Sequence, residues 1–254
     1  MIVIAGKPLS TEEAARFSTG VTEKAVVNIM MSSSSTYRYD SADQLKFELQ
    51  LRREIVAMSR AQNSSGLDFS IFRKSRCNPD YWQRTPDGGF RMKNGIRASD
   101  AIRDIFKNGS EYATECATAL LIVYYGALLN IYPEDLYNRT FRSIYLMNWH
   151  RIDPLLQSVG SMYRSNDYFP GDRRYFANPD VNPLTPEWQG ENTFDLGGGL
   201  YYGHGIGITT ADKIIYELNQ NRAPNADDSA RLLDSAGRPD FDSLYDIYRR
   251  SAAA

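Results

Sequence analysis

The segment Ser110–Asn130 constrains the fold most, because it changes from polar to almost continuously apolar along its length. Its body, Ala117–Leu129, is apolar on every face of a helix, which predicts a central, buried helix. The side chains of Asn108 or Ser110 can accept the free N–H groups of a first turn, so we expect the helix to start near them. Cys116 would then lie in the second turn.

Cys116 would lie near the positive end of this helix, where a thiolate is favoured over a thiol. The dipole effect fades after the first turn, so a second group would have to complete the activation of the thiol. A free cysteine in an apolar helix is more often an inert small hydrophobe than a nucleophile. The rest of the chain must therefore decide between a structural and a catalytic cysteine.

The composition of the 254-residue chain allows one large domain or two small ones. Its 29 basic and 31 acidic residues give a formal charge of −2, and this balance offers no basic surplus for nucleic acid. With 42% hydrophobic and 12% aromatic residues, the chain can build a sizeable folded core. We see no internal repeat and no linker, and expect a single catalytic domain over 1–250 with a disordered tail at 251–254.

The chain has two cysteines, Cys77 and Cys116, and two histidines, His150 and His204, which are too few and too scattered for a structural zinc site. One disulfide is arithmetically possible. However, no signal peptide is visible at the N-terminus, which favours a reducing compartment with both thiols free. Cys77 stands beside Asn78-Pro79 in a predicted turn, and we interpret it as structural or incidental. The apolar run of the central helix is shorter than the roughly 18 residues of a membrane span, so we expect a soluble protein.

Local patterns predict a mixture of helices and strands. The predicted helices start at Thr11 and at Ser41, where Gln44 would complete a capping box, and others cover 99–107, 133–138, 210–219, 227–233 and 241–248. The predicted strands cover 2–5, 143–149, 192–196 and 200–204. Two further edge strands are predicted on either side of a turn at 86–89. The segment 166–188 contains four prolines and is predicted to be a long, functional loop.

The hairpin predicted over 192–204 has Glu191 and His204 at its outer ends. Those ends meet in an antiparallel pair, so the two residues can share one site. If this end of the hairpin packs against the start of the central helix, either residue can serve Cys116 as a base. A thiol partnered by a histidine and a third polar group is the general pattern of cysteine acyl-transfer enzymes.

The other candidate bases are Glu115 and His150. Helical neighbours point about 100° apart, so Glu115 should not face the Cys116 side chain directly unless the helix start is irregular. His150 follows Trp149 at a strand end, and we interpret it as structural. The ordinary pKa values of a carboxyl and a thiol differ by about four units. Burial of Glu191 against Trp188 would raise the pKa of its carboxyl and narrow that gap.

Several spaced motifs support a known family. Thr-Glu-Cys-Ala-Thr-Ala at 114–119, Asn-Trp-His at 148–150, Trp-Gln-Gly-Glu-Asn at 188–192 and Gly-His-Gly-Ile-Gly at 203–207 closely resemble the small transglutaminase of spore-forming bacteria, as do 47–52 and 101–104. That family is a protein-glutamine γ-glutamyltransferase. The resemblance implies an α+β fold, with a central and mostly antiparallel sheet packed around the buried helix. It also implies a relation to the papain-like NlpC/P60 hydrolases.

The resemblance further implies roles for individual residues. Cys116 would be the nucleophile, Glu191 its carboxylate partner and His204 the histidine of the site, while Glu115 would partly substitute as base. The family's site lies in a tunnel with aromatic walls, for which the matching positions are Phe69, Trp149, Trp188 and Tyr175. No metal, calcium or other cofactor is implied. The oxyanion donors are expected among the backbone N–H groups at the helix start.

The implied substrates are proteins with reactive glutamine and lysine side chains, in particular those of the spore coat. The resemblance implies a monomer of the mother-cell cytoplasm and spore coat, with no nucleic-acid or membrane partner. Two alternatives remain at this stage. One is a cysteine peptidase or amidase of the NlpC/P60 type, with water as acceptor. The other is a non-catalytic coat scaffold in which Cys116 is merely buried. The sequence leaves open whether Glu191 or His204 takes the thiol proton.

Overall fold

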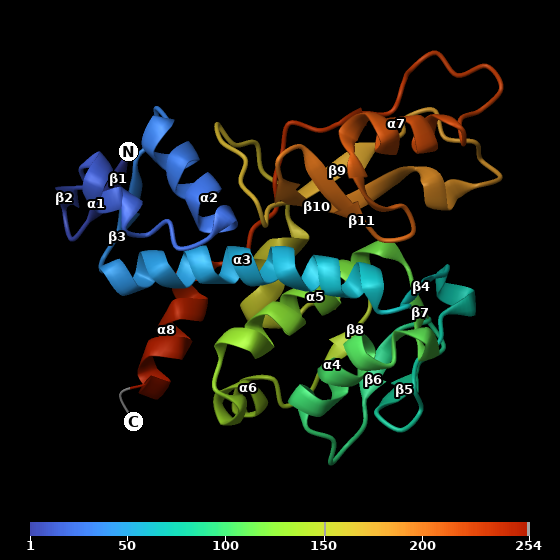
Figure 1. Ribbon diagram of the computed structural model, residues 1–254. Coiled ribbons are helices and arrows are strands. Elements are labelled where there is room, and N and C mark those ends of the chain that lie inside the picture. Colours follow the sequence, from blue (N-terminus) through green and yellow to red (C-terminus); the bar gives the residue numbers. More distant parts are fainter. Residues whose placement is uncertain (150, 253–254) are drawn as a thin grey trace.

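Two helices form the centre of the molecule. The computed structural model describes residues 1–149 and 151–252, so the interpretation of His150 falls outside the described residues. The long helix α3 (Ala42–Ser64) runs across the molecule, and α5 (Cys116–Ile131) packs along it (Figure 1). Every residue of α5 between Ala117 and Leu128 is buried. The prediction of a buried central helix that carries the cysteine is confirmed.

Helix α5 begins at Cys116 and not near Asn108 or Ser110, so the predicted start was wrong. Ser110 belongs to a separate 3-10 turn, η2 (Gly109–Glu111), and Asn108 is the residue before that turn. Cys116 is the first helical residue, preceded by the N-cap residue Glu115. The thiol therefore lies at the end of the helix, where the dipole acts most strongly.

A short strand pair causes this late start. Strand β7 (Ala113–Thr114) pairs in parallel with β4 (Asp68–Phe69), with Thr114 opposite Phe69. The pairing keeps the chain extended up to the helix. Because β4 is distant from β7 in sequence, the residue patterns near α5 do not reveal this pairing. It also brings Phe69 beside the cysteine.

A five-stranded antiparallel sheet lies above the two helices in Figure 1. Its order is β12 (Gly207–Thr210), β11 (Leu200–Gly203), β10 (Gly190–Gly197), β9 (Arg173–Ala177) and β13 (Arg231–Leu232). Strand β10 contacts α5, where the rings of Phe194 and Tyr124 meet edge-on with centroids 5.0 Å apart. In the predicted hairpin, Thr193 pairs with Gly203. Glu191 and His204 therefore lie at the same end, as expected.

Two other predictions about this sheet were wrong. The segment expected to be a loop, 166–188, contains β9 in the interior of the sheet, and the helix expected over 227–233 is replaced by β13. Leu232 of β13 pairs with Phe176 on the edge of β9 that β10 leaves free. Ala230, the residue before β13, donates its N–H to the Asn219 side chain at 2.8 Å. An available strand edge thus outweighs local propensity.

The N-terminal residues build a small lobe around the start of α3 (Figure 1). Its elements are β1 (Ile2–Ile4), β2 (Lys7–Pro8), α1 (Thr11–Ala15), α2 (Val21–Ser32) and β3 (Tyr37–Tyr39). Helix α1 starts as predicted, whereas α2 and β3 were not predicted. At the start of α3 only half of the expected capping box forms. Ser41 accepts the Gln44 N–H, but Gln44 accepts the N–H of Asp40.

The remaining elements cover the other side of α5 and the ends of the sheet. They are η1 (Phe72–Lys74), β5 (Trp82–Arg84), β6 (Phe90–Met92), α4 (Ala98–Lys107), α6 (Glu134–Thr140), β8 (Tyr145–Leu146), η3 (Pro154–Gly160), η4 (Pro186–Trp188), α7 (Ala211–Asn219) and α8 (Phe241–Ala252). The hairpin β5–β6 and the helices α4, α6, α7 and α8 agree with the sequence patterns. The strand predicted over 143–149 is shorter than expected. The predicted tail begins too early, because α8 continues to Ala252.

A buried ion network fastens α3 to the segment that leads into β9. The Arg52 guanidinium lies 2.8 Å from both Glu48 and Asp172, and Arg238 lies 2.7 Å from Asp172. Burial alone would raise the pKa of the Asp172 carboxyl, but the two arginines hold that pKa below its usual value. Each buried charge is therefore compensated. Among the described residues, no helix is long and apolar enough to cross a membrane.

Candidate active site

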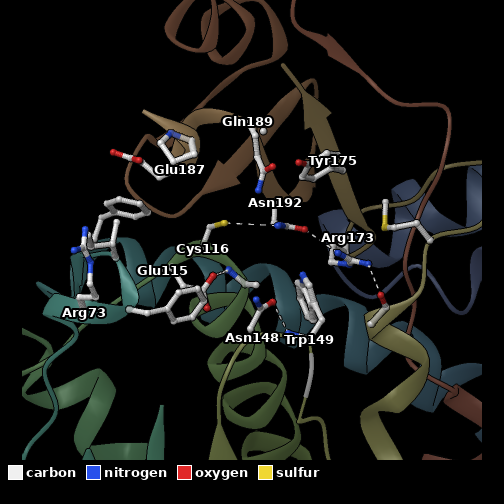
Figure 2. A pocket seen from close by; sticks show the side chains of 18 of the residues that line it. Arg73, Glu115, Cys116, Asn148, Trp149, Arg173, Tyr175, Glu187, Gln189 and Asn192 are labelled. Atoms are coloured by element: carbon white, nitrogen blue, oxygen red, sulfur yellow. Dashed lines mark hydrogen bonds between the residues drawn. The ribbon is translucent and has the colours of Figure 1, made fainter. Parts of the chain in front are cut away.

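Cys116 opens onto a cavity of about 870 Å³ between the start of α5, strands β9 and β10, and the loops before them. Figure 2 shows the sulfur facing the Asn192 side chain, with Trp149 and Arg173 on one side and Glu187 at the rim. This room beside the thiol is large enough for a side-chain amide. The described residues contain no group of three or more histidine, cysteine, aspartate or glutamate side chains that could hold a metal ion.

Glu115 serves first as the N-cap of α5. Its carboxylate accepts the N–H groups of Ala117 at 2.6 Å and Thr118 at 2.8 Å, and it also accepts the Thr118 hydroxyl. Burial raises the pKa of Glu115, although these hydrogen bonds oppose the shift. The two N–H groups are consequently unavailable to an oxyanion. Our expectation that donors at the helix start would stabilise an oxyanion therefore fails for this pair.

Glu191 lies on β10 close enough to Cys116 for the two charges to interact. Its carboxyl is buried, and Oε1 has no hydrogen-bond partner within the described part of the chain. A Cβ atom on Gly203 would lie 2.9 Å from this oxygen, so the glycine makes space for it. Burial raises the pKa of Glu191 well above its ordinary value, Glu115 adds to the shift, and the backbone N–H of His204 opposes it.

The pKa of the Cys116 thiol is also raised, by burial first and then by the charges of Glu191 and Glu115. The side-chain amide and backbone N–H of Asn192 lower it. Because the Glu191 charge raises the pKa of the Cys116 thiol, a carboxylate on Glu191 and a thiolate on Cys116 disfavour each other. A carboxyl and a thiol in this relation can exchange a proton, as a general base and a nucleophile do.

His204 lies near Glu191, but its ring is engaged elsewhere. Nε2 lies 3.1 Å from the carbonyl oxygen of Asp68, and Nδ1 lies 3.4 Å from the Tyr202 hydroxyl. Like Glu191, the ring borders a separate small cavity and not the main Cys116 cavity, and burial lowers the pKa of His204, which favours a neutral imidazole. Of the two bases left open by the sequence, the geometry favours Glu191. The β4–β7 pair, which holds Asp68 in place, explains why the ring turns away.

Three of the four predicted aromatic residues line the cavity, namely Phe69, Trp149 and Tyr175. Trp188 does not. It lies beside a second, small cavity of about 40 Å³ that Phe69, Glu191 and His204 also line. The rim of the main cavity includes Leu184, which is 87% exposed. Leu184 was not singled out from the sequence.

The sequence reasoning missed Asn192, although it lies in the quoted Trp-Gln-Gly-Glu-Asn motif. Its Nδ2 donates to the Cys116 sulfur at 3.6 Å, and its Oδ1 accepts from Arg173 at 2.7 Å. Strand alternation could have suggested this role, because Glu191 and Asn192 project to opposite faces of β10 and only one of them lines the main cavity. Arg173 had no sequence signal, because β9 itself was not predicted.

A cysteine at a helix N-terminus, a buried carboxyl that can share its proton and an open cavity with aromatic walls define the class of cysteine-dependent acyl-transfer enzymes. A profile of the family described as protein-glutamine gamma-glutamyltransferase matches residues 1–248. The chain belongs to this family and is an acyltransferase, which confirms the resemblance noted in the sequence.

Individual relatives agree. The protein-glutamine gamma-glutamyltransferase of Bacillus cereus strain B4264 is 45% identical over 218 residues, which are 86% of this chain and 78% of the relative. That of Bacillus mycoides strain KBAB4 is 44% identical over the same extent. A transglutaminase structure from Geobacillus stearothermophilus, without its C-terminal extension, aligns with a TM-score of 0.77 and 45% identity. It covers 82% of this chain and 99% of that one. The mixed helix and sheet fold is therefore confirmed, while the relation to NlpC/P60 hydrolases stays a prediction.

Proposed function

We propose that Cys116 and Glu191 form the catalytic pair of this transglutaminase. Glu191 accepts the proton of the Cys116 thiol, and the sulfur attacks the carboxamide carbon of a protein glutamine. The Asn192 amide, already directed at the sulfur, donates to the developing oxyanion. The C–N bond then breaks, Glu191 returns the proton to the leaving nitrogen, and ammonia departs. A γ-glutamyl thioester remains on Cys116.

A lysine ε-amine resolves this thioester. It enters the cavity and loses a proton to Glu191 as its nitrogen attacks the thioester carbon. The C–S bond then breaks, and Glu191 returns the proton to the sulfur. The products are an ε-(γ-glutamyl)lysine isopeptide bond and a free thiol. Water at the same position would give glutamate instead. The rings of Phe69, Trp149 and Tyr175 favour the amine by limiting the water around the thioester.

One observation supports this assignment above the others. Glu191 is buried, Cys116 is half-buried at a cavity with room for an amide, and the Glu191 charge acts on the thiol. Glu115 is the N-cap of α5, so we assign it chiefly to holding the cysteine in place. His204 acts through its backbone N–H, which favours the Glu191 carboxylate.

The test is the calcium-free incorporation of a fluorescent primary amine into a glutamine-containing protein. Incorporation by the wild type and its loss in Cys116→Ala support the proposal. The matched control is Cys77→Ala, which removes the other free thiol and should leave incorporation unchanged. Peptide cleavage without incorporation would indicate the peptidase alternative. If neither reaction occurs, Cys116 is a buried structural residue.

We further propose that the substrates are proteins of the spore coat, and that the enzyme works as a monomer in the mother-cell cytoplasm and at the coat. The support is the resemblance to the transglutaminase of spore-forming bacteria. A fluorescent fusion followed through sporulation tests the location, and a uniform distribution through all cells would contradict it. Light scattering of the purified enzyme measures its molar mass and so tests whether it is a monomer.

A further inference from the structure

Arg173 is a buried cation without an acidic partner among the residues that the structure describes. Its side chain is on β9 beside the Cys116 cavity, and the residue is 3% exposed. Within the described residues, 1–149 and 151–252, no carboxylate lies within ion-pair distance of its guanidinium. The buried Arg52 shows the contrast, because its guanidinium contacts both Glu48 and Asp172. Buried charges are normally paired.

The stacking and hydrogen-bond partners of Arg173 in residues 1–149 and 151–252 are neutral. The guanidinium stacks 4.2 Å from the ring centre of Trp149, Nη1 donates to Asn192 Oδ1 at 2.7 Å, and Nη2 donates to the Gly160 carbonyl at 3.3 Å. Nε is buried and has no partner in the part of the chain that the structure describes. The charge is therefore held in place without being neutralised.

Arg173 also determines how the Asn192 amide is oriented. A guanidinium has only donors, so the atom of Asn192 that faces it must be the carbonyl oxygen. The NH₂ group is thereby left to face Cys116, whose sulfur lies 3.6 Å away (Figure 2). In the opposite orientation two donors would meet at 2.7 Å. The contact between Arg173 and Asn192 thus fixes a donor on the sulfur.

The charges around Cys116 explain why such a cation is useful. Glu115 at the start of α5 and Glu191 on β10 both oppose a negative charge on the sulfur. The other titratable or charged side chains on the cavity wall include Tyr175 on β9, Glu187 on η4 and Arg73 on η1. Arg173 is the cation on the strands that face this side of the cavity, and it interacts favourably with the thiolate. An arginine stays charged even where burial lowers its pKa.

We propose that Arg173 is a positioning residue for the transfer reaction, which orients Asn192 and balances the negative charge that forms at Cys116. The proposal rests on the assignment of Cys116 as nucleophile. A missing counter-ion is expected here, because the anion that Arg173 balances exists only during turnover. Arg174 is the matched control. It is also buried and stacks on Tyr168, but it donates to the carbonyls of Leu233 and Ser235.

The experiment measures the rate of Cys116 alkylation by iodoacetamide against pH, in the full chain without substrate. Burial raises the pKa of the Cys77 thiol to about 11, and a Cys77→Ala background removes its remaining signal. In Arg173→Gln, the pH of half-maximal alkylation should rise by about one unit or more. Arg173→Lys, which keeps the charge, should recover part of the shift. Arg174→Gln should match the wild type.

The steady-state kinetics should agree. Loss of an ionic hydrogen bond predicts a fall in kcat of about ten- to a hundredfold in Arg173→Gln, with KM changed less than about threefold. If Arg173→Gln does not fold, Asn192→Asp provides the test, because it keeps the shape but removes the donor and pairs Arg173 with a carboxylate. It should raise the alkylation pH in the same direction.

Two outcomes overturn the proposal. One is an unchanged alkylation profile in a folded Arg173→Gln or Asn192→Asp variant. The other is a fall in thermal stability with no change in that profile, which would mean that Arg173 only supports packing. The assay needs no cross-linking. A wild type that alkylates as expected but incorporates no amine would therefore contradict the proposed function and leave this inference standing.

Discussion

The substitution Glu191→Gln tests the catalytic pair with little change of shape. The glutamine has almost the same volume and fits the space that Gly203 leaves beside the carboxyl. It cannot accept a proton from Cys116. Since burial raises the pKa of that thiol, few sulfurs ionise at neutral pH without a base. General-base catalysis usually contributes 10²- to 10⁴-fold, so kcat should fall by about that factor.

Glu115→Gln is the matched comparison, because Glu115 is a half-buried glutamate next to the cysteine. Its main loss is the ionic cap on the N–H groups of Ala117 and Thr118. A glutamine oxygen can still accept one of these, so stability should fall by about 1 kcal/mol. Its kcat should fall less than about tenfold.

The assay is fluorescent amine incorporation at several pH values. Removing the negative charge of Glu191 lowers the pKa of the thiol, because that charge had opposed ionisation. The slow Glu191→Gln variant should therefore gain activity steadily as pH rises, when solvent takes the proton. Equal losses in Glu191→Gln and Glu115→Gln would refute the assignment. So would a Glu191→Gln variant that retains most of the wild-type kcat at neutral pH.

Three further predictions follow from the same structure. Chelators such as EDTA should leave the incorporation rate unchanged, and a clear fall would contradict a mechanism that uses only side chains. In the wild type, kcat/KM should fall at acid pH with a midpoint above the ordinary carboxyl pKa of about 4.3, because the base form of Glu191 appears only above its raised pKa. A midpoint near pH 4 would show an exposed carboxyl. Asp172→Asn leaves Arg52 partly unpaired, so it should lower the free energy of unfolding by about 3 kcal/mol or more in urea. The exposed pair Asp43–Lys46 is its control, and Asp43→Asn should cost less than about 1 kcal/mol.

Local sequence patterns predicted the elements whose stability is local. The apolar body of α5, the hairpin β10–β11 and the amphipathic helix α4 depend on residues close in sequence. Elements that depend on distant partners were missed. Strand β13 forms because β9 has a free edge, and the late start of α5 depends on the pairing of β7 with β4.

The residues of the site divide in the same way, into those that a local motif indicates and those that depend on distant strands. Cys116 and Glu191 could be assigned from their motifs, and the structure brings them close enough for their charges to interact. The orientation of His204 could not be predicted, because it depends on the carbonyl of Asp68 on a distant strand. Arg173 and Asn192 form one unit only when β9 and β10 are paired, so neither residue alone carries a sequence signal for it.

The most direct test of the central claim is the mass of the acyl-enzyme. The enzyme is mixed with a glutamine peptide in the absence of amine, quenched in acid and analysed by mass spectrometry after digestion. We predict a mass increase equal to the peptide minus ammonia, located on Cys116 and released by hydroxylamine. A modification on Cys77, or no covalent adduct under conditions where ammonia is released, would contradict it.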